Sequence, residues 1–155
     1  MNIIRKPTPH HSARPDSAVI SCIVLHCDAG RSEEGTISWL ANPDSKVSYH
    51  YLVGRGGAVY QFVDEDRKAW HAGVSSFGGM KFCNNYSIGC SFANRNDGEP
   101  YTDEALAAMT ELCRDLMTRY PVISRDRVTA HYVVSPTRKS DPAPPFDLTA
   151  FVAAL

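Results

Sequence analysis

Several features are missing from these 155 residues. No charge of one sign dominates, because 16 Lys and Arg face 17 Asp and Glu and the net charge is −1. This balance gives no electrostatic case for nucleic acid or an anionic membrane as the main partner. No segment approaches the roughly 20 apolar residues of a membrane span, and the first residues, MNIIRKPTPHHSARP, lack the apolar run of a signal peptide. We expect no membrane insertion, and synthesis in the cytosol unless another system exports the protein.

Local metal motifs are also missing. The five cysteines are odd in number and irregularly spaced, with no CxxC pair, which argues against a disulfide framework and against a cysteine zinc knuckle. We expect most of them to be small core residues. No HExxH sequence is present either. Any metal site must therefore be assembled from residues that are distant along the chain.

What remains is the composition of an ordinary soluble globular protein, with 43% hydrophobic and 21% charged residues. A chain of this length can bury roughly 70% of its unfolded surface in one domain. We expect a single, monomeric α/β domain over residues 1–155, with a central mixed β-sheet flanked by helices. Residues 1–17 contain three prolines, and we interpret them as an irregular N-terminal arm.

Hydrophobic periodicity and turn residues predict the elements of this domain. The run AVISCIVLH is apolar and β-branched, which is typical of a central strand covered on both faces. The predicted strands are 18–26, 48–54, 58–63 and 86–92, with 127–134 as a short strand or extended segment. The predicted helices are 32–42, 102–120 and a last turn from Asp147 to the end. A glycine turn at 56–57 makes 48–63 a hairpin.

Three side chains form a candidate metal site. His26 ends the first strand, where side chains emerge at the edge of an α/β sheet. His131 similarly ends an apolar stretch, and Asp141 follows in a loop stiffened by prolines, SPTRKSDPAPPF. Two imidazoles and a carboxylate can hold zinc and leave a fourth tetrahedral position for water. The residues alone leave open the alternative that His26 is a hydrogen-bonded structural histidine.

Two further residues are candidates for catalysis. Lys139, two positions before Asp141, is either a solvated loop lysine or a cation that stabilises the oxyanion formed when a carbonyl is attacked. Tyr49 is either a half-buried strand aromatic or a phenol that orients water. His50 follows it directly, and an undistorted strand would send the two side chains to opposite faces. Both could then not serve one site.

Other polar and aromatic residues have two open interpretations each. His10 and His11 lie in the proline-rich arm, where we expect them to be solvated. His71, in AWHAG, either lines a cleft or is structural. Trp70 is either a core residue or a flat platform for a sugar or peptide.

Three blocks carry a resemblance to a known family: SYHYLVGRGGAVYQFVDEDRKAWHAG, NNYSIGCSF and AHYVVSPTRKSDPAPPF. In this order they resemble the zinc-dependent N-acetylmuramoyl-L-alanine amidases of the type-2 amidase and peptidoglycan recognition protein superfamily, from about Ile20 to Phe146. The resemblance implies that fold and one Zn²⁺ per chain, bound by His26, His131 and Asp141.

The resemblance also assigns roles in catalysis and substrate binding. It places the catalytic tyrosine at Tyr49, to orient water or relay a proton, and the catalytic lysine at Lys139, to stabilise the oxyanion. Trp70, His71 and Asn85 become candidates for a groove that binds peptidoglycan or muropeptides.

One position departs from the recycling members of the family. They have a glutamate in the block SIGIE, and this chain has Ser91, as recognition-protein-like members do. An acid–base role therefore does not pass to Ser91.

The implied reaction is hydrolysis of the amide between N-acetylmuramic acid and L-alanine in bacterial peptidoglycan. We expect a bacteriolytic, endolysin-type enzyme that reaches the cell wall after release or export. One alternative is a cytosolic muropeptide-recycling amidase, which Asp141 favours and Ser91 disfavours. Another is a non-catalytic peptidoglycan-binding module, and the plainest is a soluble α/β domain with scattered histidines.

Overall fold

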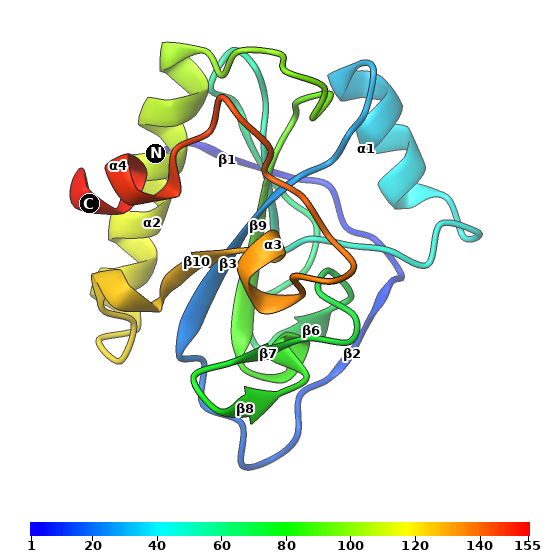
Figure 1. The fold of residues 1–155 in the computed structure, drawn as a ribbon. Helices are drawn as coiled ribbons and strands as arrows, with labels where there is room; N and C mark the ends of the chain where they lie inside the picture. Colours follow the sequence, from blue (N-terminus) through cyan, green and yellow to red (C-terminus); the bar gives the residue numbers. More distant parts are fainter.

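A six-stranded mixed sheet forms the centre of the computed structural model, which describes residues 1–155 (Figure 1). In spatial order its strands are β1 (Ile3–Arg5), β5 (Val59–Gln61), β4 (Tyr51–Val53), β9 (Ser87–Phe92), β3 (Cys22–Cys27) and β10 (Val128–Ala130). Strands β4 and β5 pair antiparallel, and all other neighbours in this sheet pair parallel. Helices flank the sheet on both sides, which confirms the predicted α/β class.

Strand β3 is buried along its whole length, as its apolar sequence predicts. Its side chains alternate between two cores. Ile23, Leu25 and Cys27 belong to the main hydrophobic cluster, whereas Cys22 and Val24 belong to a smaller cluster on the opposite face. By the same alternation, His26 shares the second face.

The long helix α2 (Asp103–Arg119) covers the main core. Thr102 caps it by accepting a hydrogen bond from the backbone amide of Ala105 at 3.2 Å, and Met109, Leu112 and Leu116 are fully buried on its inner face. Helix α4 (Leu148–Ala153) lies beside α2 on the same side of the sheet (Figure 1). Both predicted helices are confirmed.

The opposite side of the sheet carries α1 (Glu33–Ala41), which Ser32 caps (Figure 1). Its Leu40 packs in a third cluster with Leu52 of β4. The hairpin prediction is confirmed as well, since β4 and β5 pair in register and Gly57 adopts a φ of 80° in the turn, a conformation that glycine adopts at little cost.

The N-terminal arm is not irregular, which corrects the prediction for residues 1–17. Strand β1 adds to the sheet edge beside β5, and β2 (His11–Ala13) pairs antiparallel with β6 (Arg67–Ala69). Strands of three residues are too short to show a period, so only their partners define them. His10, expected to be solvated, is 4% exposed, and its Nε2 lies 2.7 Å from the carbonyl oxygen of Asn42.

The segment 127–134 is also only partly extended. Strand β10 ends at Ala130, and the chain turns at once into the single-turn helix α3 (His131–Val134). The remaining elements are β7 (Ser76–Phe77), β8 (Met80–Lys81) and the short 3₁₀ helices η1 (Cys83–Asn85) and η2 (Arg125–Arg127). All five cysteines are buried and free, as predicted. None of the helices combines the length and the apolar character needed to cross a bilayer.

Candidate metal centre

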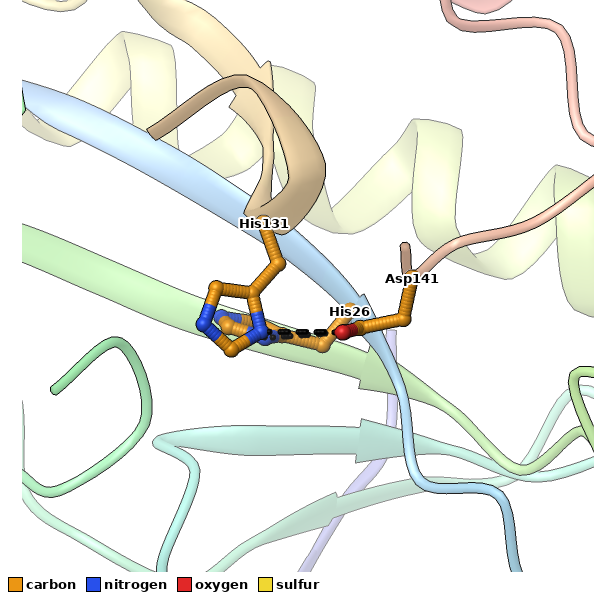
Figure 2. Close-up of side chains that lie close together, drawn as sticks. All are labelled: His26, His131 and Asp141. Atoms are coloured by element: carbon orange, nitrogen blue, oxygen red, sulfur yellow. Dashed lines mark hydrogen bonds and ion pairs between the residues drawn. The ribbon is translucent and has the colours of Figure 1, made fainter. Parts of the chain in front are cut away.

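The structure brings together His26, His131 and Asp141 at one edge of the sheet (Figure 2). His26 lies near the end of β3, and His131 directly follows β10. Because these strands are parallel neighbours, their carboxyl ends meet at the same edge. The proline loop then returns Asp141 to this edge, where its carbonyl accepts a hydrogen bond from the Tyr132 amide at 3.0 Å and its Oδ2 accepts one from the Cys27 amide at 3.4 Å.

The spacing of the three side chains suits one small cation. His26 Nδ1 lies 3.0 Å from His131 Nδ1 and 3.4 Å from Asp141 Oδ2, and His131 Nδ1 lies 3.1 Å from the same oxygen. Bonds of about 2.0–2.1 Å at tetrahedral angles separate ligand atoms by about 3.3 Å. Two imidazole nitrogens and a carboxylate at these distances therefore fit the donor set of a divalent metal ion such as zinc.

The electrostatics of the site favour metal binding at neutral pH. Burial lowers the pKa of His26 from 6.5 to about 4, so its imidazole is neutral. The Asp141 carboxyl is an acid whose ordinary pKa is about 3.9, so it is ionised at neutral pH. The centre therefore offers a neutral ring nitrogen and a carboxylate anion, which are the protonation states that bind metal.

Tyr49 adjoins this centre. Its ring centroid lies 5.2 Å from that of His26, and burial raises the pKa of its phenol above the usual value, so the hydroxyl keeps its proton. His50 was expected to point away from Tyr49, yet its ring centroid lies only 5.7 Å from that of His71, beside the same cluster. The reason is that β4 begins at Tyr51, so residues 49 and 50 precede the regular alternation.

Lys139 lies on the exposed part of the proline loop, and its backbone amide donates to the carbonyl of Ser135 at 3.0 Å. Burial is the largest cause of the lowered pKa of His26, and the positive charge of Lys139 also lowers it. Lys139 also lies two residues before Asp141 in the same loop.

The three candidate substrate residues are placed differently from one another. Trp70 and Asn85 line a common hollow of about 340 Å³, which none of the three metal-facing side chains lines. His71 lines no open groove; it is 5% exposed, and its Nδ1 lies 3.0 Å behind His26, at Nε2. The cleft interpretation of His71 therefore does not agree with its position.

The sequence analysis did not predict a second hollow, of about 410 Å³. Tyr49, whose ring lies beside that of His26, is one of the residues that line it. Its walls include Asp28 and Arg31 from the turn after β3, together with Trp39 of α1. The indole of Trp39 is 51% exposed although the next residue, Leu40, is fully packed. A large aromatic on the outer side of a short helix was the available signal. A further hollow between α2 and α4 lies on the other face of the sheet and contains none of these residues.

The chain is similar to known proteins in sequence and in structure. Residues 15–144 match the Amidase_2 family, described as N-acetylmuramoyl-L-alanine amidase. The 1,6-anhydro-N-acetylmuramyl-L-alanine amidase AmpD of Citrobacter freundii is 37% identical over 166 aligned residues, covering 96% of this chain and 88% of that protein.

Two solved structures extend the comparison. The crystal structure of a selenomethionine AmpD derivative gives a TM-score of 0.88 at 32% identity and covers 99% of this chain and 94% of the other. The amidase AmiD from E. coli, in complex with the substrate anhydro-N-acetylmuramic acid-L-Ala-D-γ-Glu-L-Lys, gives 0.79 at 28% identity. That match covers 91% of this chain and 60% of AmiD.

Proposed function

The chain belongs to the Amidase_2 family of N-acetylmuramoyl-L-alanine amidases, and from that premise we propose that it cleaves soluble 1,6-anhydro-muropeptides in the cytosol, as a recycling enzyme. One observation carries the proposal: the match to a 1,6-anhydro-N-acetylmuramyl-L-alanine amidase extends over 96% of this chain and 88% of that protein. The comparisons support the endolysin-type prediction less well. Asp141, which the sequence analysis connected with recycling members, agrees with the proposal, and Ser91 remains its exception.

The reaction is hydrolysis of the amide between the lactyl carbonyl of N-acetylmuramic acid and the amino group of L-alanine. Water adds to the carbonyl carbon, the carbon–nitrogen bond breaks, and the departing amine takes up a proton. The products are a muramic acid carboxylate and a free stem peptide. No covalent link to the protein is needed.

We propose that His26, His131 and Asp141 hold one Zn²⁺ per chain. When bound, Zn²⁺ supplies a Lewis acid that polarises a carbonyl and lowers the pKa of a coordinated water to about 7. The contribution of the chain is the geometry: ligand atoms 3.0–3.4 Å apart on two buried imidazoles and one carboxylate. A catalytic zinc site of this kind has three protein ligands and one open position.

Tyr49 and Lys139 supply the polar groups around the reacting carbonyl in this proposal. Tyr49 retains its proton because burial raises the pKa of its phenol, so it can donate a hydrogen bond to the attacking water or the substrate. The side chain of Lys139 is exposed and can place its ammonium beside the developing oxyanion. Ser91 is fully buried, and its hydroxyl donates to the Phe92 carbonyl at 3.3 Å. We therefore give Ser91 no role in proton transfer and assign that role to Tyr49 and Lys139.

Substrate binding is assigned first to the hollow beside Tyr49. Trp39 offers a half-exposed indole face for a sugar ring, and Arg31 offers a cation for a stem-peptide carboxylate. The hollow lined by Trp70 and Asn85 is a second place for a remote part of the substrate.

The test compares two substrates. Purified enzyme is given intact sacculi or soluble 1,6-anhydro-muropeptides at equal concentrations of the amide, and mass spectrometry measures released stem peptides. The proposal expects rapid release from the soluble substrate and little from sacculi. Equal or faster release from sacculi would restore the lytic function. Absence of release from either, with the substrate still bound, would support the binding-module alternative.

A further inference from the structure

We infer that residues 71–72, held in place by the side chain of Asn84, fix the tautomers of both metal-facing histidines. We call His71, Ala72 and Asn84 the tautomer clamp. It makes His71 and Asn84 positioning residues, because neither of them is among the three proposed ligands. The inference rests on the proposed metal centre and adds to it a device that aims the two imidazoles.

The first half of the clamp acts on His26. The hydroxyl of Ser87 donates its only proton to the carbonyl of Cys83 at 2.6 Å, so its oxygen must accept from His71 Nε2 at 3.2 Å. A neutral imidazole carries a single proton, so with Nε2 as the donor the Nδ1 of His71 is left as an acceptor. That nitrogen accepts from His26 Nε2 at 3.0 Å. His26 consequently carries its proton on Nε2 and a lone pair on Nδ1.

The second half acts on His131. Its Nε2 faces the carbonyl oxygen of Ala72 at 3.4 Å. A carbonyl can only accept, so the proton lies on Nε2 and the lone pair on Nδ1. Arg138 holds the same carbonyl by donating to it from Nη2, at 2.5 Å, and to the carbonyl of Val74 at 3.1 Å. Adjacent residues of one segment thus orient both rings.

These tautomers leave three acceptors facing one another. The lone pairs of His26 Nδ1 and His131 Nδ1 meet at 3.0 Å, and Asp141 brings a carboxylate oxygen to 3.1 Å from the latter. No hydrogen-bond donor remains between them. Such an arrangement is favourable only around a cation, and a hydrogen bond behind each ligating histidine is what gives a metal site its orientation.

Asn84 holds the segment by its backbone. Its Oδ1 accepts hydrogen bonds from the amides of His71, at 3.3 Å, and of Ala72, at 2.8 Å. On the other side, Gly89 of β9 leaves just the space that the ring of His71 needs. A Cβ on Gly89 would lie 2.4 Å from His71 Cγ, so any larger residue would displace the ring.

The test measures Zn²⁺ affinity of the full chain by competition with a chelator, beside the absorption spectrum of the Co²⁺-substituted protein. His71→Asn keeps an acceptor atom at the δ1 position, whereas His71→Leu has similar size and none. We expect His71→Leu to weaken Zn²⁺ binding about 10- to 100-fold and to alter the Co²⁺ spectrum, and His71→Asn to stay within about threefold of the wild type.

A second pair of variants guards against a folding defect at position 71. Asn84→Asp keeps an oxygen for the two amides, and Asn84→Ala removes it; we expect about tenfold weaker Zn²⁺ binding for the alanine variant alone. His11→Leu, in β2, is the control that removes an imidazole outside the clamp. Equal Zn²⁺ affinities for His71→Leu and His71→Asn, or for Asn84→Ala and the wild type, would overturn the clamp while leaving the metal centre intact. A wild-type chain that binds no Zn²⁺ would overturn both.

Discussion

The two faces of strands β3 and β9 contrast sharply although alternate residues of the same two strands form them. One face presents Ile23, Leu25 and Ile88 to α2 and forms the main core. The other presents His26 and Ser87, and it has a glycine where a side chain would otherwise stand. Strand alternation thus lets one rigid pair of strands support both stability and chemistry. Damage to one face should therefore leave the other largely unchanged.

Loss of a ligand is the strongest way to separate the two faces. We expect His26→Ala to lose stoichiometric Zn²⁺ binding and to lower kcat/KM on 1,6-anhydro-muropeptides by more than about 10³-fold, because two ligands hold the metal weakly. Metal content by mass spectrometry and peptide release check this. His11→Ala, which removes an imidazole from β2, is the matched control. A His26→Ala protein with full zinc and normal turnover would show that the centre lies elsewhere.

Removal of the exposed cation tests the chemistry without touching either core. Lys139→Ala should lower kcat about 10²- to 10³-fold with little change in KM, since an oxyanion contact acts mainly in the transition state. The midpoint of thermal unfolding should stay constant because the side chain is exposed. Steady-state kinetics on the soluble substrate provide the measurement, with Lys6→Ala, an exposed lysine directly after β1, as the control. A loss confined to KM would assign Lys139 to substrate binding.

The converse experiment damages the apolar face. Leu116 of α2 is fully buried in the main core, and Leu116→Ala should reduce the free energy of unfolding by about 2–5 kcal/mol. Zinc affinity and kcat per folded molecule should stay within about twofold of the wild type, because the cavity opens on the side away from His26. Urea denaturation and metal titration check the two halves. A similar loss of zinc affinity would show that the faces are coupled.

The sequence predicts those helices and strands that are long enough to show a hydrophobic pattern of their own. The helix predicted over 102–120 is observed over 103–119 because it spans several periods. The buried strand predicted over 18–26 ends within one residue of its observed end, but the observed strand begins only at Cys22. Strands β1 and β2 have three residues each and are defined by β5 and β6, so no local pattern could reveal them. Likewise, the turn at His131 depends on where pairing with β3 ends.

The same limit applies to the candidate site: the sequence indicates which residue types are present, but not how they are arranged in space. The types of the metal-facing residues and the resemblance pointed to His26, His131 and Asp141, but only the parallel neighbours β3 and β10 bring the two imidazoles together. His71 was placed in a substrate groove because nothing local reveals the ring of His26 behind it. Gly89, in the interior of strand β9, was the one available sign of a close approach.

The smallest expected effect concerns a charged group at the margin of the apolar face. Glu65 accepts hydrogen bonds from the hydroxyls of Tyr51, at 2.5 Å, and Tyr120, at 2.7 Å, and pairs with Arg119. Burial acts to raise the pKa of this carboxyl, but these partners outweigh it and lower the pKa below its ordinary value. The folded state therefore binds fewer protons than the unfolded state. The stabilisation from the Glu65 carboxylate is complete above the unfolded pKa of about 4.3, and it is lost as the pH falls through the folded pKa.

Glu65→Gln should accordingly reduce the free energy of unfolding by about 1–2 kcal/mol at pH 7, and by less at pH values below the folded pKa of Glu65, where the wild-type carboxyl is itself protonated. Urea denaturation of both proteins across this range gives the difference directly, and Asp147→Asn, at the cap of α4, provides a carboxylate control on another element. A difference that does not shrink toward acid would mean that Glu65 stabilises the fold through its shape and not its charge. Zinc affinity should not change in either case, because Glu65 bonds to Tyr51, whose side chain lies on the face of β4 turned toward α2 and away from the histidines.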